Sequence, residues 1–173
     1  INKIKMVISD IDGVWTDGSI YVGNEESEIK KFNVNDGAGV ALLRQSGMSL
    51  ALISGRKSNA TALRASELKI EDVYNGILNK LIPYEELKSK YNLDDSEIAY
   101  IGDDLIDIPV MEKVAVPIAT QNASGACKSV AVHVTDKSGG EGAFREAVEW
   151  ILIEQDRLEK VILDLKNQLL NRK

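Results

Sequence analysis

The sequence predicts an α/β fold around a mainly parallel sheet. Short apolar runs such as MVIS, LALI and IAYI alternate with segments of helical periodicity, a pattern typical of strand–helix–strand units. The chain of 173 residues is long enough to bury one core, and its composition, 44% hydrophobic and 28% charged, is that of an ordinary globular protein. No repeat or linker divides it, so we expect a single domain over residues 1–173.

The first strand is expected at residues 4–9, where apolar residues lead directly into an acidic run. Residues 19–33 (SIYVGNEESEIKKFN) predict a hairpin of two short strands around a polar Gly-Asn turn. Asp36 is the expected N-cap of the next helix, and Gly47 is expected to close that helix.

Further strands follow along the chain, and we expect them at residues 48–53, 73–74, 98–101, 114–119 and 131–134. One helix should run from just after Ser54-Gly55 to about Leu68. Another should span residues 80–91, because a proline such as Pro83 is tolerated in the first turn of a helix.

The C-terminal segment predicts one long helix over about residues 143–171, after three closely spaced glycines. Its apolar residues recur at intervals of three and four and form a stripe, at Leu158, Val161, Leu165 and Leu169. We expect the first half of this helix to pack on the domain and its far end to project towards a partner chain.

The charge and cysteine content exclude several classes of protein. A net charge of -6 argues against binding to nucleic acid, whose phosphate backbone requires a basic face. The single cysteine, Cys127, excludes an internal disulfide framework and suits a reducing cytoplasm. No apolar stretch approaches the ~20 residues that span a bilayer, so we expect no membrane insertion and a cytoplasmic protein.

Polar residues follow four of the predicted elements in a suggestive order. Asp10 and Asp12 end the first strand, Ser54 ends the next, Lys80 begins a helix, and Asp103 with Asp104 follows a later strand. Because ligands bind beyond the carboxyl ends of parallel strands, these groups are expected to share one site. Together they predict phosphoryl transfer.

Asp10 and Asp12 are candidates for the covalent chemistry. They are two residues apart in an extended segment, so their side chains face the same way. A carboxylate can attack phosphorus and form an acyl phosphate, and a second one can protonate the leaving oxygen and later accept a proton from water. A solvated aspartate-rich turn explains these two residues equally well when they are considered alone.

The later aspartates favour a metal site over such a turn. Magnesium binds hard oxygen ligands and needs only one or two carboxylates, so Asp10, Asp103 and the backbone carbonyl of Asp12 are its expected ligands. Asp104 and Asp107 could orient these ligands or cap the following helical turn, and we interpret Asp107 as a cap.

The remaining candidates would bind the substrate. The Ser54 hydroxyl and the Gly55 amide could hydrogen-bond a phosphoryl oxygen, and Lys80 could hold phosphate beside Asp10. Arg56 and Arg64 could bind a carboxylate of the substrate, although arginines are common on helix surfaces.

Three other features have ordinary structural explanations. His133 and Cys127 are expected to be structural. The glycines at 139–142 could bind an anion through free amides, but a turn that starts a helix explains them as well.

The motifs resemble those of known phosphatases. DIDGVWTDG, Ser54-Gly55-Arg56, Lys80 and GDDLID are similar, in order, to the four motifs of the haloacid dehalogenase superfamily. KFNVNDGAG, ISGRKS with Arg64, NGILNK, IAYIGDDLIDIPVMEKV and GGEGAFRE resemble the 3-deoxy-D-manno-octulosonate 8-phosphate (KDO 8-phosphate) phosphatase family, over most of residues 4–155.

This resemblance implies a Rossmann-like three-layer core without a cap domain, a Mg2+ cofactor and a homotetramer assembled through the projecting hairpin at about 19–33. It implies hydrolysis of KDO 8-phosphate, an acidic sugar phosphate of lipopolysaccharide precursor synthesis, with neighbouring subunits closing each site. The catalytic residues carried over are Asp10, Asp12, Ser54 and Lys80. The substrate contacts carried over are Asp12, Asn33, Val34, Asn35, Asp36, Gly37, Gly55, Arg56, Arg64 and Lys80.

The chain departs from the family pattern at two places. Ala41 stands where many relatives carry an arginine, so one substrate contact is expected to be missing. The segment after Gln155 is longer and more helical than the usual tail.

Three alternative functions fit the sequence less well. A receiver domain carries its lysine after the hydroxyl residue, on its final motif, whereas Lys80 of this chain precedes the Asp103-Asp104 pair. A phosphatase for a nine-carbon keto-deoxy acid 9-phosphate usually has an acidic residue and a lysine in place of Gly55-Arg56. A non-catalytic tetramerisation module would not need to retain the four catalytic and metal-binding positions.

Overall fold

The computed structural model describes residues 1–24 and 27–171. Its main sheet has six parallel strands in the order β5-β4-β1-β6-β7-β8. They are β1 (Met6–Ser9), β4 (Ser49–Ser54), β5 (Asp72–Asn75), β6 (Ile98–Gly102), β7 (Val116–Ala119) and β8 (His133–Val134). The first strand of the chain thus lies inside the sheet, between β4 and β6, and the predicted parallel α/β fold is confirmed.

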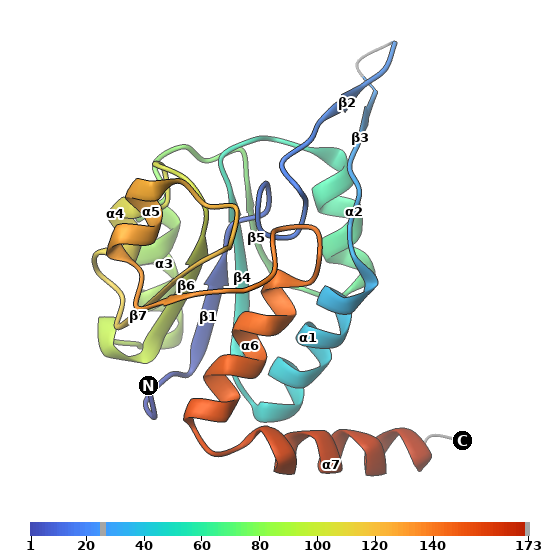
Figure 1. The fold of residues 1–173 in the computed structure, drawn as a ribbon, viewed down its shortest axis with the longest axis vertical. Helices are drawn as coiled ribbons and strands as arrows, with labels where there is room; N and C mark the ends of the chain where they lie inside the picture. Colours follow the sequence, from blue (N-terminus) through green and yellow to red (C-terminus); the bar gives the residue numbers. More distant parts are fainter. Residues whose placement is uncertain (25–26, 172–173) are drawn as a thin grey trace.

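Helices cover both faces of this sheet (Figure 1). One face packs on α1 (Val34–Ser46), α2 (Asn59–Glu67), α6 (Ala143–Glu154) and α7 (Leu158–Leu170). The other packs on α3 (Leu81–Tyr91), α4 (Ile108–Met111) and α5 (Gly125–Val130). Successive residues of β1 alternate between the two cores, with Val7 in one and Met6 and Ile8 in the other. The arrangement is the expected three-layer core.

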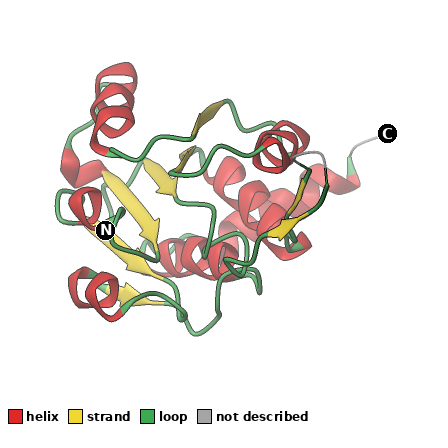
Figure 2. Cartoon of the chain, turned by 90° about the horizontal axis from the view of Figure 1, so that it is seen from above, coloured by secondary structure: helices red, strands yellow, loops and turns green. Residues whose placement is uncertain are grey.

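A small hairpin stands apart from the main sheet (Figures 1 and 2). Its strands β2 (Tyr21–Val22) and β3 (Glu28–Ile29) pair antiparallel within the predicted range of 19–33. Residues 25 and 26, next to the predicted Gly-Asn turn, lie outside the described residues. Tyr21, Val22 and Ile29 are all exposed, so this hairpin, called the arm below, presents an apolar surface to solvent.

The predicted start of α1 is wrong by one turn of helix. Asn33, not Asp36, is the N-cap, and its side chain accepts a hydrogen bond from the amide of Asn35. Asp36 is buried in the first turn, where one carboxylate oxygen accepts a hydrogen bond from the Arg145 amide at 3.1 Å. The residue therefore connects α1 to α6. Gly47 ends the helix with φ 81, as predicted.

The prediction of one helix over about 143–171 is also wrong. The helix stops at Glu154, and the chain turns through Asp156, whose φ of 54 is left-handed, before α7 begins at Leu158. The Arg157 amide donates a hydrogen bond to the Leu152 carbonyl at 2.8 Å, and the Arg157 side chain donates one to the Ser46 carbonyl. The apolar periodicity continues through this turn, so it could not reveal the break.

Helix α7 folds back across α1 instead of projecting along α6 (Figure 1). Val161 is buried, and Leu158 and Leu165 pack against the core. Ala41, where a substrate contact was expected to be missing, lines a groove of about 810 Å³ between α1 and α7. No helix in the described part of the chain is both long and apolar enough to cross a membrane.

Short elements complete the fold. The sequence did not predict α5, a helix capped by Ser124, or the 3-10 turn at Asp95–Glu97, because each has too few residues for a periodic pattern.

Candidate active site

Asp10 lies directly after β1 in the middle of the sheet, and its side chain is almost fully buried. Its amide donates to the Ile101 carbonyl of β6 at 2.9 Å, which fixes the backbone at this point. One carboxylate oxygen is 2.7 Å from the Lys80 Nζ. Burial, followed by the charge of Asp107, raises the pKa of Asp10 to about 6, against the opposing effect of Lys80.

Lys80 is fully buried at the N-terminal end of α3. Its ammonium joins Asp10 and Asp107, each at 2.7 Å. Burial alone would lower the pKa of Lys80, but the two carboxylates outweigh it and raise that pKa above its ordinary value. The lysine therefore remains a cation beside Asp10, as its predicted role requires.

Asp107 is the N-cap residue of α4, as interpreted, but its side chain does not make the capping hydrogen bond. Its carboxylate makes no hydrogen bond to the helix and turns back towards the preceding loop. It accepts hydrogen bonds from the Asp103 amide at 2.9 Å and the Asp104 amide at 3.2 Å, as well as from the Tyr100 hydroxyl at 2.6 Å. Asp107 thus fixes the loop that carries Asp103.

The carboxylates of Asp10, Asp103 and Asp107 form a compact acidic cluster. Each offers an oxygen atom, and the three atoms lie within 4.8 Å of one another. Burial, followed by the charges of Asp10 and Asp107, raises the pKa of Asp103 to about 8. A divalent cation relieves such repulsion, and the all-oxygen ligand set suits magnesium. Asp107 is already engaged by Lys80, Tyr100 and two amides, so Asp10 and Asp103 are better placed to hold the ion.

Gly13 brings the loop after β1 close to this cluster. Its φ is 90, and a Cβ atom there would lie 2.0 Å from a carboxylate oxygen of Asp103. Its carbonyl accepts hydrogen bonds from Thr120 and Asn122. Gly139 packs directly against this carbonyl: a Cβ atom added to Gly139 would lie 2.0 Å from the Gly13 oxygen.

This close packing gives the glycine segment at 139–142 a structural explanation. The Gly139 amide donates to Asn122 at 2.6 Å, and the Gly140 amide donates to the Val14 carbonyl at 3.2 Å. These two amides are therefore not free to bind an anion.

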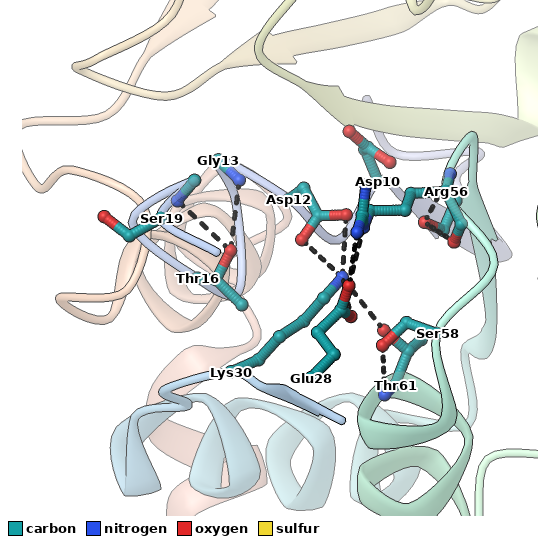
Figure 3. A network of polar contacts seen from close by, with 12 residues as sticks. Asp10, Asp12, Gly13, Thr16, Ser19, Glu28, Lys30, Arg56, Ser58 and Thr61 are labelled. Atoms are coloured by element: carbon teal, nitrogen blue, oxygen red, sulfur yellow. Dashed lines mark hydrogen bonds and ion pairs between the residues drawn. The ribbon is translucent and has the colours of Figure 1, made fainter. Parts of the chain in front are cut away.

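Asp12 faces an ion-pair partner that the sequence analysis missed. Lys30 of the arm is buried, and its Nζ lies 2.6 and 2.8 Å from the two oxygens of Asp12 (Figure 3). The two residues are 18 positions apart and belong to different elements. A buried lysine requires a counter-charge, but nothing in the sequence marks Lys30 as buried, since its neighbours Ile29 and Lys31 are exposed.

Ser54 is buried at the end of β4 and is bonded to its own turn. Its hydroxyl donates to the Arg56 carbonyl at 2.9 Å and accepts from the Arg56 amide at 3.3 Å. These bonds shape the turn after β4, and the predicted contact of Ser54 with a phosphoryl oxygen remains a prediction.

An open cleft of about 410 Å³ lies over the acidic cluster, lined by Asp10, Asp12, Gly18, Ile20, Gly55, Arg56, Leu78, Asp103, Asp104 and Ile106. Arg56 reaches the cleft while its guanidinium contacts Glu28 of the arm at 2.6 Å (Figure 3). The strand ends have therefore brought the predicted nucleophile, acid/base, metal ligands and one arginine to one place.

Other predicted substrate contacts do not line the cleft. Arg64 pairs with Glu67 at 2.7 Å on the side of α2. Residues 33–37 form the start of α1, and none of them is among the described residues that line the cleft. The half-buried His133 stacks on Trp150 with ring centroids 4.2 Å apart, and Cys127 is buried in the core beside Met111, so both make structural contacts.

Several known proteins have sequences similar to that of this chain. Residues 56–145 match the family model of haloacid dehalogenase-like hydrolases. The 3-deoxy-D-manno-octulosonate 8-phosphate phosphatase of Yersinia pestis is 43% identical over 157 residues, which cover 91% of this chain and 84% of that protein. The corresponding enzyme of Escherichia coli strain K12 is 41% identical over 158 residues, which cover 91% of this chain and 84% of that protein.

Solved structures agree with this relationship. The crystal structure of the Yersinia pestis phosphatase has a TM-score of 0.88 and 42% identity, covering 91% of this chain and 85% of that one. The Moraxella catarrhalis phosphatase, solved with magnesium, phosphate and KDO, has a TM-score of 0.90 and 38% identity. The match covers 94% of this chain and 93% of that one. The chain therefore belongs to the 3-deoxy-D-manno-octulosonate 8-phosphate phosphatase family of haloacid dehalogenase-like hydrolases.

Proposed function

We propose that this protein is a magnesium-dependent phosphatase that hydrolyses KDO 8-phosphate to KDO and phosphate, a step of lipopolysaccharide precursor synthesis. The observation that carries the proposal is the buried Asp10, held by Lys80 at 2.7 Å beside the Asp103 carboxylate at the floor of an open cleft. The Moraxella catarrhalis relative, which was solved with both products of this reaction, supports the choice of substrate.

In the first half of the reaction, Asp10 acts as the nucleophile. Lys80 holds one of its carboxylate oxygens, which leaves the other to attack phosphorus. The new bond between oxygen and phosphorus forms as the bond to the sugar oxygen breaks, and Asp12 donates a proton to that leaving oxygen. The products of this half are KDO and a phosphorylated Asp10.

In the second half, Asp12 accepts a proton from a water molecule that attacks the phosphorylated Asp10. Phosphate leaves and the Asp10 carboxylate is restored. Lys80 stays beside Asp10 throughout as a fixed positive charge. Magnesium bound to Asp10, Asp103 and the Asp12 carbonyl would offset the repulsion between carboxylate and phosphate.

Substrate recognition is proposed to use both the cleft and a neighbouring subunit. Arg56 would bind the substrate carboxylate after releasing Glu28, and Gly55 and Ser54 would contact the phosphoryl group. Arg64 and the segment 33–37 lie outside the cleft of their own chain, so we propose that they act in a homotetramer, where subunits close one another's sites. The exposed apolar arm supports such an assembly.

We place the reaction in the cytoplasm, a proposal supported by the single, unpaired Cys127.

The test is phosphate release, with magnesium, from a panel of sugar phosphates. The panel contains KDO 8-phosphate, the nine-carbon keto-deoxy acid 9-phosphate and common hexose phosphates. We expect a value of kcat/KM at least ~10-fold higher for the eight-carbon acid than for the hexose phosphates, since a site built to bind a carboxylate rejects analogues that lack it. The nine-carbon acid also carries a carboxylate, so the comparison with it tests the fit of the longer sugar chain.

A preference for the nine-carbon acid would replace the proposed substrate with its alternative. No release from any substrate, by folded protein with magnesium present, would favour a non-catalytic tetramerisation module.

A further inference from the structure

Lys30 is a charged residue at the base of the arm that the proposed mechanism does not use. Its side chain is fully buried, and its ammonium lies 2.6 and 2.8 Å from the two oxygens of Asp12. Burying an unpaired charge costs several kcal/mol, so this lysine depends on Asp12 for its place in the fold. Among the described residues, no other side chain hydrogen-bonds the Asp12 carboxylate.

Other elements hold the ammonium from the side opposite Asp12. The Thr61 hydroxyl of α2 lies at 3.5 Å, and a carboxylate oxygen of Glu28 in β3 lies at 3.8 Å. Figure 3 shows Lys30 extending from the arm between Asp12 and α2. The position of the ammonium is therefore set by the arm, α2 and the loop after β1 together.

We infer that Lys30 is the positioning residue for Asp12. An ammonium that binds both oxygens of a carboxylate restricts rotation about the side-chain bonds of that aspartate. The inference rests on the proposed function, in which Asp12 must face first the leaving oxygen and then the attacking water. Lys30 does not line the cleft, so it acts on the reaction through Asp12.

This role predicts a dependence on the leaving group. A sugar alkoxide needs a proton from Asp12 in order to leave, whereas nitrophenolate leaves without one. The second half of the reaction needs Asp12 for either substrate. Loss of Lys30 should therefore slow both halves with KDO 8-phosphate but only the second half with p-nitrophenyl phosphate.

The experiment compares Lys30→Met with Lys160→Met, a control at a lysine of α7 outside the arm, whose side chain is 80% exposed. For Lys30→Met, we expect kcat on KDO 8-phosphate to fall about 10–100-fold with little change in KM, the usual loss when an orienting partner is removed. Rapid mixing with p-nitrophenyl phosphate should give a burst of nitrophenolate equal to the enzyme concentration. Lys160→Met should show neither effect.

Two further variants separate positioning from a purely structural role. Lys30→Arg keeps a cation against Asp12 and should recover most of the lost rate. In the Asp12→Asn background, Lys30→Met should cause no further loss, because residues that act through one another are not additive. Equal losses on both substrates without a burst, or additive losses in the double variant, would overturn the inference.

The failure of the proposed function is distinguishable from the failure of this inference. A wild-type protein that hydrolyses p-nitrophenyl phosphate but not KDO 8-phosphate would contradict the substrate, while the burst would still report on Lys30. A Lys30→Met protein that behaves like Lys160→Met would contradict the inference alone.

Discussion

Asp10 and Asp12 lie two residues apart, yet each carboxylate is paired with a different buried lysine. Lys80, at the start of α3, lies 2.7 Å from Asp10, and Lys30, from the arm, lies 2.6 Å from Asp12. The proposed nucleophile and the proposed acid/base are thus positioned by separate elements. A change at one lysine should therefore affect one carboxylate more than the other.

The role of Asp10 can be tested by Asp10→Asn. We expect phosphate release to fall at least ~10³-fold, because the amide cannot form the acyl phosphate. The fold should be retained, since the amide has nearly the same shape and Lys80 keeps its contact with Asp107. Phosphate release and thermal unfolding measure the two effects.

A matched control for this substitution is Asp164→Asn in α7, where the carboxylate is 41% exposed and pairs with Lys160. It should leave both activity and melting temperature unchanged. An Asp10→Asn protein with substantial activity would show that the nucleophile is another residue.

The buried carboxylate of Asp36, away from the proposed metal ligands, should make the stability of the protein depend on pH. Burial raises the pKa of Asp36 to about 6, against the opposing charges of Arg64, Lys137 and Arg145. The folded pKa lies above the unfolded one, so the protein loses stability as pH rises from about 4 to about 6. Above this range the loss is complete, and it amounts to at most ~3 kcal/mol.

Asp36→Asn should remove this dependence. We expect the variant to be more stable than the wild type at pH 7, with a difference that shrinks towards pH 4. Its carbonyl can still accept the hydrogen bond from the Arg145 amide. Urea unfolding at a series of pH values measures the difference, and a constant difference across pH would contradict the assignment.

At the scale of the elements, the sequence predicted best which residues the parallel sheet brings together at its strand ends. Asp10 and Asp103 each follow an apolar run that forms a buried parallel strand, and the carboxyl ends of such strands meet. Knowledge of the strand positions was therefore enough to bring these residues together. Lys80 was placed by its position at the start of a predicted helix, next to the same edge.

Contacts that depend on the path of the chain could not be predicted in this way. Lys30 reaches Asp12 only because the arm folds back beside α2, and Asp107 turns towards the preceding loop instead of its own helix. The turn at Asp156 keeps the apolar residues in register, so α6 and α7 look like one helix in the sequence. Local periodicity contains no information about such contacts.

The packing of α7 on α1 can be measured by Val161→Ala. Val161 is the buried residue of α7, so its truncation should lower the free energy of unfolding by about 1–3 kcal/mol. The matched control is Leu163→Ala, whose side chain is exposed and should matter by less than ~0.5 kcal/mol. Equal effects would show that α7 is not packed as described.

At the scale of the whole molecule, the site is open and the arm is apolar. The cleft is lined on one side by Ile20 and Gly18, at the base of the arm, and Arg56 contacts the arm through Glu28. Among residues 1–24 and 27–171, no element forms a cap domain over the cleft, so we expect a neighbouring chain to exclude water from it. We propose that a second subunit, held by the arm, both covers the apolar arm and closes the cleft to water.

Val22→Lys tests this proposal, because Val22 is the most exposed apolar residue of the arm, at 77%. A charge at a buried interface is costly, so, if the wild type forms the proposed tetramer, we expect the variant to sediment as a smaller species than the wild type and to release phosphate more slowly. Val132→Lys, at a residue that is 62% exposed on the main body, should change neither property. Sedimentation velocity and phosphate release on the same samples decide the matter: a fully active wild-type monomer would show that each chain closes its own site.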